Sequence, residues 1–563
     1  MEKKNYISSY NDKKWDEVRS HPYFAKVREG ALSLGEELLA TEPLPIRFSD
    51  MHKFEAEGVR GPYTSRTDPY FRRLSVFYFC YMLTKEEKYL TALADVIWQI
   101  CDFETWATNA HVKEALSLHD RKGYLELVSC SVGFRIAEIL YYIGDDLPEL
   151  VARRARAELR TRIIDAFKEK TGEKDFNWYT KTNNWSAVCA ALVLGCFLYA
   201  AEKDEIDAAI PRLIRITDYF VSGMEEDGCC LEGYGYWVYG YSHYCLFAHM
   251  LMEYTDGRIN LFENKKVREA AFFQTRIALN DHQCVSFSDG GTKYNPCLWL
   301  AHFLKGVYPD LPVPEREPPA YTPGFCNQVL WLDPYMKGEP LAPESHIFSD
   351  AQWFIHIGES YSVGAKAGKN SEPHNHNDIG SFIISKDNNI TFSDPGGGEY
   401  VKTYFGAGRY THLVTSARGH SVPVINGHIQ CWGEEKARLL VTEADRFAFT
   451  CEHAYPSECR ETLESFVRDI RCLKDAMILT DSFSFTEEPT SLVEQFVSLT
   501  PIEGENGSIT CGASRLTYDA DLFDMELTSE SFRRNSGKEE TLYILKLSAR
   551  KLDRELSFAF RFD

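Results

Sequence analysis

Histidines and carboxylates gather in one short stretch of the chain and just beyond it. His374 and His376 stand two residues apart in the run His-Asn-His-Asn-Asp. Asp394 follows 18 residues after His376, and His420 comes 26 residues later. Imidazole nitrogens and carboxylate oxygens bind divalent metals at about 2.0–2.2 Å. In an extended segment, residues two apart project to the same side. One histidine could therefore ligate a metal while the other faces a substrate.

The spacing of these histidines has a second interpretation. Histidine pairs in loops are often surface polar residues or partners in a hydrogen-bond network. A short motif is a hypothesis until its structural context is known. The spacing by itself leaves both interpretations open.

Length and charge bound the class of protein. A chain of 563 residues is too long for one core, so two or three domains are expected. The formal net charge of −21 argues against nucleic acids and anionic membranes as partners. An anionic substrate would need a locally positive cleft. Aromatic residues make up 13% of the chain, which suits either stacking on sugar rings or a large aromatic core.

The cysteines and the N-terminal residues indicate the cellular compartment in which the protein is expected. The 16 cysteines form no Cys-x-x-Cys pair, and the first 15 residues contain no apolar segment typical of a signal peptide. Reduced thiols in a cytoplasmic enzyme are therefore expected. The longest apolar run, about 187–201, is shorter than the roughly 20 residues of a membrane span and predicts a buried helix.

Hydrophobic periodicity changes along the chain. Before residue 280, apolar residues recur with the helical period, and paired helices of this kind form a helical toroid. Short alternating strands rich in Val, Ile and Phe dominate from 350 onward. We therefore predict an N-terminal (α/α) toroid, an incomplete barrel, over 1–315. A Pro-rich linker over 316–345 and a C-terminal antiparallel β-sandwich over 346–563 follow it.

Smaller features lie within the helical half. Residues 60–75 contain two prolines and read as a loop. Asn183 and Asn184 open the apolar helix that is expected to run to 202, where an asparagine is commonly a cap. The stretch 227–241 interleaves tyrosines with glycines, which allow a backbone to approach a ligand closely. A tyrosine-rich packing wall is the alternative.

Taken in order, these motifs resemble the heparinase II/III-like polysaccharide lyases. That family includes heparan sulfate, chondroitin/hyaluronan and alginate lyases. The resemblance implies an (α/α) toroid joined to an antiparallel β-sandwich. The matching segments are Asn183-Asn184-Trp185, Glu232–Trp237, His374–Phe382, Asp394-Pro395-Gly396 and Arg418–Gly427.

The resemblance implies β-elimination on a uronic acid residue. A weakly acidic C5 proton is removed while the neighbouring carboxylate is neutralised, a role that the resemblance gives to Asn184. Tyr236 and His374 are the implied acid and base. We expect Tyr236 to act as the acid, and as the base for substrates whose C5 proton lies on its side. His374 would serve as the base for the opposite epimer, or as a partner of the substrate carboxylate.

The resemblance also implies a structural metal and substrate contacts. His376, Asp394 and His420 would bind one divalent ion, with zinc expected and manganese or calcium as alternatives. Many relatives have a histidine where Trp185 stands, which removes one candidate base. The residues expected to contact substrate are Trp185, Tyr234, Tyr239, Arg409 and Arg66.

The leading hypothesis is a lyase that gives 4,5-unsaturated uronate ends, with a glycosaminoglycan or its oligosaccharides as substrate. Heparan sulfate or heparin, chondroitin sulfate and hyaluronan are the named polymers. The alternatives are an alginate or oligoalginate lyase, a non-catalytic carbohydrate-binding protein, or an (α/α)-barrel glycoside hydrolase using Asp227 and Glu232. The sequence also leaves open whether the protein forms a homodimer.

Overall fold

The computed structural model describes residues 6–7, 11–291, 293–324 and 326–563. Part of the N-terminal stretch in which no signal peptide is expected therefore lies outside the described residues. The chain forms two compact units. The first comprises Met1–Gly223, Val238–Arg268 and Cys297–Glu339, and the second comprises Met224–Trp237, Glu269–Pro296 and Pro340–Asp563.

This division differs from the boundaries expected from the sequence. Two stretches before residue 315 belong to the second unit, and most of the expected linker, 316–345, belongs to the first. Local sequence patterns do not predict which unit these segments join, because tertiary packing decides it. The second unit therefore contains most of the tyrosine-rich stretch, residues 227–237.

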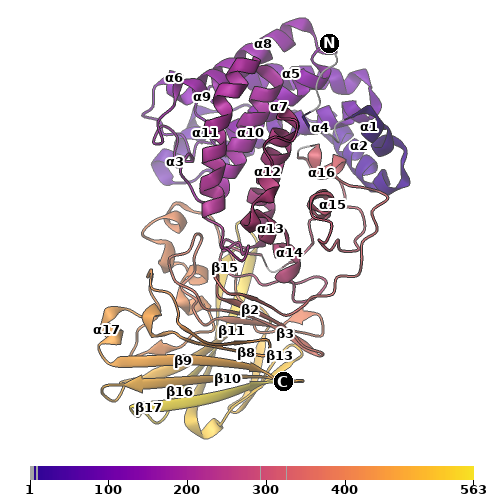
Figure 1. The fold of residues 1–563 in the computed structure, drawn as a ribbon. Coiled ribbons are helices and arrows are strands. Elements are labelled where there is room, and N and C mark those ends of the chain that lie inside the picture. The colour runs from indigo at the N-terminus through magenta and orange to yellow at the C-terminus, as the bar shows by residue number, and fades with distance from the viewer. Residues whose placement is uncertain (1–5, 8–10, 292, 325) are drawn as a thin grey trace. The chain divides into compact units, whose positions relative to one another are not determined.

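Helical hairpins build the first unit (Figure 1). Consecutive helices are joined by short connections, as between α4 and α5 or between α10 and α11. Neighbouring hairpins also pack together, as α7 does against α10. The helices assigned mainly to this unit are α1 (Asp12–Ser20), α2 (Ala25–Leu39), α3 (Phe48–Glu57), α4 (Gly61–Thr84), α5 (Glu87–Asp102), α6 (Leu118–Lys122), α7 (Leu127–Ile143), α8 (Glu149–Leu159), α9 (Ala166–Glu169), α10 (Asn184–Ala200), α11 (Lys203–Ser222), α12 (Tyr234–Tyr254), α13 (Lys265–Ala271), α15 (Leu298–Val307) and α16 (Asn327–Leu330).

Side-chain patterning separates inner from outer helices. Almost every residue of α10 is buried, because the helix is apolar on all sides. Its neighbour α11 buries one stripe, which includes Ile206, Ile210 and Leu213, and exposes the rest. Figure 1 shows α10, α11 and α12 side by side, and the Tyr254 hydroxyl of α12 donates to Asp207 of α11 at 2.6 Å. The predicted helical toroid is confirmed.

The stretch 60–75 is helical, and the expectation of a loop there is wrong. It forms the first part of α4, with Pro62 in the opening turn, where a missing N–H costs nothing. Pro69 lies inside the helix, and much of the surrounding helix is buried. Tertiary packing therefore outweighs the local cost of that proline.

Antiparallel sheets build the second unit. The strand orders are β1-β2-β3-β4-β5, β12-β13-β14-β17-β10-β9-β8-β7 and β15-β16-β11-β6. The predicted antiparallel β-sandwich is confirmed. The strands are β1 (His346–Phe348), β2 (Trp353–Ile357), β3 (Tyr361–Lys366), β4 (Phe382–Lys386), β5 (Asn389–Ile390), β6 (Val424–Ile425), β7 (Leu439–Glu443), β8 (Arg446–Thr450), β9 (Leu463–Cys472), β10 (Met477–Phe485), β11 (Leu492–Ser498), β12 (Ile502–Glu505), β13 (Ser508–Cys511), β14 (Ser514–Thr517), β15 (Phe523–Arg533), β16 (Glu539–Ala549) and β17 (Glu555–Phe562); two short helices, α14 (Phe273–Arg276) and α17 (Ser457–Arg460), accompany them.

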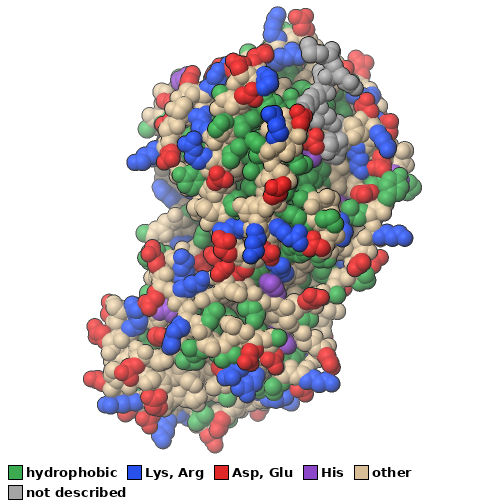
Figure 2. Space-filling model, in the orientation of Figure 1, with side chains coloured by type: hydrophobic (Ala, Val, Ile, Leu, Met, Phe, Trp, Pro, Cys, Tyr) green, Lys and Arg blue, Asp and Glu red, His purple; other side chains and the backbone are tan. Residues whose placement is uncertain are grey.

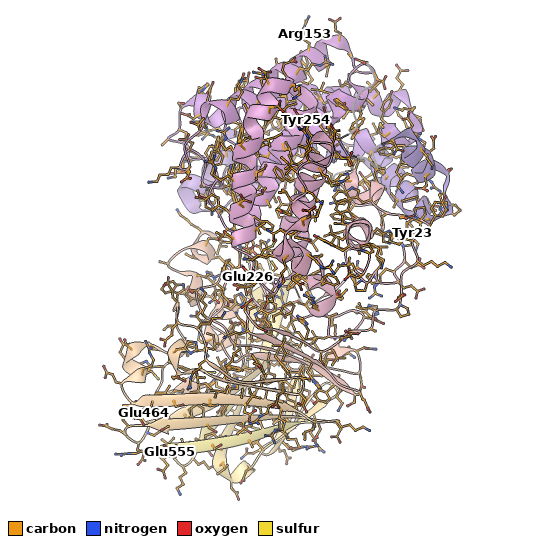
Figure 3. All side chains as sticks on the ribbon, viewed as in Figure 1. Tyr23, Arg153, Glu226, Tyr254, Glu464 and Glu555 are labelled. Atoms are coloured by element: carbon orange, nitrogen blue, oxygen red, sulfur yellow. The ribbon has the colours of Figure 1, made fainter. Side chains whose placement is uncertain are left out.

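Alternation along the strands defines the sandwich core. In β10, every second residue is buried, from Met477 to Phe485. Successive side chains of a strand point to opposite faces, so this pattern places one face on the core. On the other face, Glu464 and Glu555, labelled in Figure 3, both accept hydrogen bonds from the Ser484 hydroxyl.

A buried charge cluster interrupts this apolar core. Arg468 of β9 pairs across the strands with Asp481 of β10, with Nε–Oδ1 at 2.8 Å and Nη2–Oδ2 at 2.5 Å. Glu494 of β11 lies 3.7 Å from the same guanidinium. Burial, followed by the charge of Asp481, raises the pKa of Glu494 well above its usual range.

Arg468 also reaches the loops that carry the histidine motifs. Its Nη1 donates to the backbone carbonyls of Gly380, at 2.7 Å, and Ser421, at 2.6 Å. Gly380 follows the His-Asn-His-Asn-Asp run, and Ser421 follows His420. The charge cluster thus braces both loops from inside the sandwich.

The surface carries both signs of charge. On the face shown in Figure 2, acidic and basic side chains are interspersed rather than gathered into one patch. All 16 cysteines are described, and each carries a free thiol. Among the described residues, none of the helices combines the length and apolar character needed to cross a bilayer.

Three buried histidines should make the helical unit sensitive to acid. Burial lowers the pKa values of His243, His249 and His302 from 6.5 to about 4. Between these values the unfolded chain binds more protons than the folded one, so the free energy of unfolding should fall as the pH falls. Each proton contributes a slope of about 1.4 kcal/mol per pH unit. In urea titrations at several pH values, H302Q should show a shallower decline than the unaltered chain. An unchanged slope would contradict this.

Removing the guanidinium of the buried cluster should destabilise the β-unit strongly. R468M leaves Asp481 and Glu494 without their cation, and breaking a buried pair costs about 3–5 kcal/mol. Urea unfolding of this variant should therefore shift to much lower denaturant concentrations. R446M is the matched control, because Arg446 pairs with Asp469 at the surface of the same unit. Equal shifts in the two variants would argue against the bracing role of Arg468.

Candidate functional site

A buried carboxylate, Asp289, stands at the centre of the histidine motif. Its Oδ2 accepts a hydrogen bond from Nδ1 of His374 at 2.5 Å, and its Oδ1 accepts one from Nε2 of His376 at 3.1 Å. The Tyr404 hydroxyl donates to Oδ1 at 2.5 Å, and Arg409 Nη2 lies 3.2 and 3.3 Å from the two oxygens. The side chain of Asp289 has no exposed surface.

The partners of Asp289 keep it ionised. Burial alone would raise the pKa of this carboxyl, but the hydrogen bonds from His374 and His376 outweigh that effect and hold it well below its usual range. The charge of Arg409 acts in the same direction. An ionised carboxylate only accepts hydrogen bonds, so both histidine nitrogens must be donors.

Glycines allow other segments to approach Asp289 closely. Gly233 has a positive φ of 95°, and a Cβ there would lie 3.1 Å from the Cα of Gly290. A Cβ at Gly396 would lie 2.3 Å from the carbonyl oxygen of Gly290. Gly397 donates its backbone N–H to that same carbonyl at 3.2 Å. The glycines beside the tyrosine motif and after Asp394 therefore serve packing around Asp289.

Tyr236 and His374 lie against each other. Their ring centroids are 4.4 Å apart, with a 35° angle between the ring planes. The Tyr236 hydroxyl lies 2.5 Å from the hydroxyl of Tyr400. Burial raises the pKa of Tyr236 well above its usual range, and the weaker effect of the Tyr400 hydrogen bond lowers it. This phenol therefore holds its proton at neutral pH.

The backbone of His374 is strained. Its φ of 56° lies in the left-handed region, which a side chain other than glycine seldom adopts. Such strain persists only where the surroundings enforce it, and it concentrates at functional sites. Here Asp289 holds Nδ1, while Oε1 of Glu232 lies 3.4 Å from Nε2.

A buried cluster of potential metal ligands lies next to this centre. His376, Asp378, Asp394 and His420 each offer a ligand atom, and these atoms lie within 4.8 Å of one another. Nδ1 of His376 and Oδ2 of Asp378 have no hydrogen-bond partner among the described residues, while Nδ1 of His420 and Oδ2 of Asp394 lie 3.0 Å apart. Buried polar atoms are rarely left without a partner. This donor set therefore fits a divalent cation.

The other polar atoms of these potential ligands form hydrogen bonds with residues outside the cluster. Nε2 of His420 donates to the Val414 carbonyl at 2.9 Å, and Oδ1 of Asp394 accepts from the backbone of Gly396 at 2.7 Å. Oδ1 of Asp378 accepts from the buried Lys366 at 2.8 Å. Contacts of this kind orient metal ligands and fix the histidine tautomers.

Two of the predicted site residues, Asn184 and Trp185, belong to the helical unit. Asn183 caps α10 by accepting from the Trp185 N–H at 3.3 Å, so Asn184 is the first helical residue. Asn184 is 4% exposed, and its Oδ1 has no hydrogen-bond partner in the described chain. The Trp185 ring packs against His111 at 4.6 Å. Gly240 permits close packing here, because a Cβ there would lie 3.0 Å from that of Asn184.

The other expected substrate-binding residues have partners inside the protein. The Tyr234 hydroxyl donates to the carbonyl of Asn295 at 2.9 Å. Tyr239 packs edge-on against His243 at 5.0 Å, and burial raises the pKa of its phenol. Arg66 pairs with Asp50 at 3.2 Å.

Arg409 is also engaged within its own unit. Besides its contact with Asp289, it donates from Nε to the carbonyl of Asn375 at 2.9 Å and from Nη1 to that of Tyr404 at 3.1 Å. The guanidinium can thus contribute positive charge, but most of its hydrogen-bonding capacity is in use.

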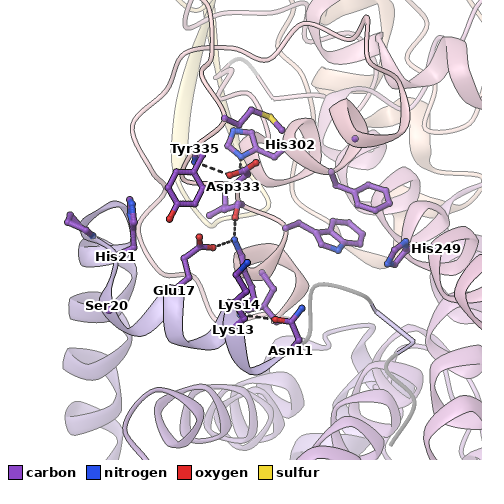
Figure 4. Close-up of a pocket in the computed structure, with 17 residues that line it drawn as sticks. Asn11, Lys13, Lys14, Glu17, Ser20, His21, His249, His302, Asp333 and Tyr335 are labelled. Carbon is purple, nitrogen blue, oxygen red and sulfur yellow. Dashed lines mark hydrogen bonds and ion pairs between the residues drawn. The ribbon is translucent and has the colours of Figure 1, made fainter. Parts of the chain in front are cut away.

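The helical unit holds a separate cavity of about 790 Å³, shown in Figure 4. None of the predicted site residues lines it. Lys14 donates to Glu17 at 2.5 Å and to the Leu332 carbonyl at 2.6 Å. His302 accepts from the backbone of Asp333 at 2.9 Å. Much of the polar lining is thus satisfied internally.

Solved structures share this architecture over nearly the whole chain. A crystal structure of heparinase III matches with a TM-score of 0.64 and 12% identity, covering 98% of this chain and 93% of that one. The chain has the heparinase III fold. The resemblance inferred from the sequence is confirmed at the level of the fold.

Two further structures with this fold extend the comparison. Heparan sulfate lyase HepC from Pedobacter heparinus matches with a TM-score of 0.57 and 14% identity, covering 98% of this chain and 92% of that one. Chondroitin AC lyase from Streptomyces coelicolor, solved with chondroitin sulphate, matches at 0.55 and 10% identity, covering 99% and 82%. No protein-family model matches the sequence, and no curated protein matches it by sequence.

Sequence reasoning missed several residues of this site. Asp289 lies in the run Phe-Ser-Asp-Gly-Gly, far from the histidines in sequence, and only the paired glycines hint at a tight turn. Asp378 stood within the recognised motif but was not assigned as a ligand. Tyr400 and Tyr404 follow the glycine run after Asp394, in a loop without regular periodicity.

The ligand cluster leads to a prediction about metal content. The purified protein should carry a divalent ion, and H420A should lose it because one of the two imidazole ligands is gone. Since bound metal stabilises the folded state, H420A and the chelated protein should melt at lower temperatures. The measurements are elemental analysis and thermal unfolding. H428A is the matched control and should keep the ion. Equal metal contents in the two variants would rule out this ligand set.

Proposed function

We propose that this protein is a polysaccharide lyase that cleaves uronic-acid-containing glycans by β-elimination. The observation that carries the proposal is the contact between Tyr236 and His374, whose rings lie 4.4 Å apart. Together they supply a phenol that holds its proton and an imidazole with a defined donor nitrogen. The fold shared with heparinase III and chondroitin AC lyase supports the same reaction class.

The geometry suggests how the two side chains divide the chemistry. His374 donates from Nδ1 to Asp289, so Nε2 carries the lone pair that can accept the C5 proton. As the C5–H bond breaks, a double bond forms between C4 and C5, and the C4–O4 bond breaks. Tyr236, whose pKa is raised by burial, protonates the departing O4. The products are a 4,5-unsaturated uronate and a new hydroxyl end.

Which group acts as base depends on the uronate epimer. In one epimer the C5 proton faces His374. In the other it faces Tyr236, which would have to give up its own proton before it could act as base and then protonate O4 as acid. The hydroxyl of Tyr400, 2.5 Å from that of Tyr236, is a partner through which the phenol could exchange its proton. Asn184 would donate its amide N–H to the uronate carboxylate and stabilise the charge that moves onto it.

An exposed aromatic side chain supports a sugar substrate. Phe405 is 57% exposed, and its ring centroid lies 6.1 Å from that of His374. It also packs edge-on against Tyr400 at 4.8 Å. A ring held in this way offers a flat apolar face to the C–H face of a sugar. The exposed Lys402 on the same loop offers a cation to an acidic glycan. We therefore infer that the substrate is a glycosaminoglycan or its oligosaccharides.

The hydrolase alternative gains no support from Asp227. Its Oδ2 accepts the backbone N–H groups of Asp350, at 2.8 Å, and Ala351, at 3.3 Å. Its Oδ1 accepts that of Cys229 at 3.1 Å. A carboxylate bonded in this way orders the backbone, so Asp227 is poorly suited to pair with Glu232 as a general acid or base.

The ligand cluster favours zinc within this proposal. Two imidazole nitrogens suit zinc or manganese better than calcium, which prefers oxygen ligands. The ion would be held by His376, Asp378, Asp394 and His420 and would stiffen the loop that presents His374. Its role is structural.

The lyase assay tests the proposal directly. We expect absorbance near 232 nm to rise when the protein is incubated with one polymer from a panel of glycosaminoglycans, alginate and other uronans. Y236F and H374A should each lower kcat by at least about 100-fold, because removing a general acid or base costs 10²–10⁴-fold. N184A should also lower kcat, through lost stabilisation of the carboxylate.

Y241F is the matched control for the phenol. The Tyr241 hydroxyl donates to the backbone carbonyl of Val267 at 2.6 Å and is fully buried. Its loss should leave turnover unchanged. A flat absorbance trace on every polymer would overturn the proposal, and release of saturated sugars would favour a hydrolase. Activity confined to alginate would correct the substrate class while keeping the reaction.

A further inference from the structure

Asp289 bonds two histidines through opposite ring nitrogens. His374 uses Nδ1, at 2.5 Å from Oδ2, and His376 uses Nε2, at 3.1 Å from Oδ1. His374 lies in a turn, with a φ of 56°, and this turn brings its ring and that of His376 to the same carboxylate. One carboxylate can therefore engage both rings, even though it comes from a distant part of the sequence.

This arrangement fixes which nitrogen of each ring carries the lone pair. A neutral imidazole has one N–H and one acceptor nitrogen. Because His374 donates from Nδ1, its Nε2 is the acceptor. Because His376 donates from Nε2, its Nδ1 is the acceptor. The same carboxylate thus selects opposite tautomers in two histidines of one motif.

Each selected nitrogen points to a different task. Nδ1 of His376 is buried without a hydrogen-bond partner in the described chain, and His376 belongs to the potential ligand cluster with Asp394 and His420. The His374 ring lies against Tyr236, and its Nε2 is 3.4 Å from Glu232. One nitrogen serves a metal and the other serves the proposed proton transfer.

The carboxylate has little freedom to turn. The Tyr404 hydroxyl donates to Oδ1, and Arg409 Nη2 reaches both oxygens. The backbone around Asp289 is closely packed as well, since Cβ atoms at Gly396 and Gly397 would meet the carbonyl oxygens of Gly290 and Asp289 at 2.3 and 3.1 Å. Asp289 is therefore a rigid support rather than a mobile acid.

We propose that Asp289 is a positioning residue that couples the metal site to the proposed base, by holding His376 and His374 in opposite tautomers. The part that concerns His374 rests on the proposed function. The part that concerns His376 depends only on the ligand cluster. Loss of this carboxylate should therefore impair metal binding and turnover together.

The variant D289N tests the coupling. An asparagine has one acceptor oxygen and a donor NH₂ group, so one histidine loses its acceptor and faces a donor instead. We expect affinity for Zn²⁺, measured by competition with a chelator, to fall about 10–100-fold. At saturating Zn²⁺, kcat should fall at least about 100-fold while KM changes less than about threefold, since a positioning residue acts on the transition state.

Two controls isolate the effect. D469N makes the same chemical change in the same unit, where Asp469 pairs with Arg446 on the surface, and should alter neither quantity. H374A should lose turnover but keep its Zn²⁺ affinity, because His374 is not in the ligand cluster. D289N should differ from D469N and H374A because it should lose Zn²⁺ affinity and turnover together.

Histidine tautomers in the unaltered protein provide a readout that needs neither a substrate nor a folded D289N variant. In the unaltered protein labelled with ¹⁵N-histidine, NMR should show His374 protonated at Nδ1 and His376 protonated at Nε2, each assigned by single-histidine substitution. The opposite tautomer in either ring would overturn the proposal. So would a D289N protein that keeps its Zn²⁺ affinity, or one that loses kcat alone. If no polymer is cleaved, the proposed function fails, while the NMR and Zn²⁺ measurements still decide the role of Asp289.

Discussion

The convergence of donors on one buried, ionised carboxylate is the constraint on which the site depends. An isolated charge in the interior would be costly, and Asp289 has no exposed side-chain surface. Two histidines, a tyrosine and an arginine supply the compensating donors. The donors stabilise the charge of Asp289, and that charge in turn holds each donor in place. The strained backbone of His374 is tolerated within this set of contacts.

A second buried charge cluster supports the same region from inside the sandwich. Arg468 and Asp481 replace an apolar cross-strand pair on β9 and β10. A well-packed hydrophobic pair would often be at least as stable there. The guanidinium contributes hydrogen bonds that an apolar side chain could not make, because its remaining donors hold the carbonyls of Gly380 and Ser421 in place. The loops of His376 and His420 are thereby tied to the rigid centre of the β-unit.

Glycine placement explains how distant segments meet. The glycines after Asp394 allow the backbone to lie against Gly290, and Gly233 allows the turn before α12 to approach the same point. From sequence alone, the glycines of the tyrosine-rich stretch suggested a close approach of the backbone to a ligand. In the structure they permit close backbone packing around Asp289, which brings the tyrosine motif and the histidine motif into one compact unit.

Periodicity along the sequence determined the fold class, because burial imposes a helical repeat before residue 280 and alternation after 350. The ordered motifs also predicted roles for Tyr236 and His374 and included three residues that the structure gathers in the potential ligand cluster. Tertiary structure alone decided that α4 continues through Pro69, that Asp289 and Asp378 complete the site, and that two early segments join the β-unit. The physical reason is that a buried carboxylate is recognised by its partners, and these come from parts of the chain that no local pattern connects.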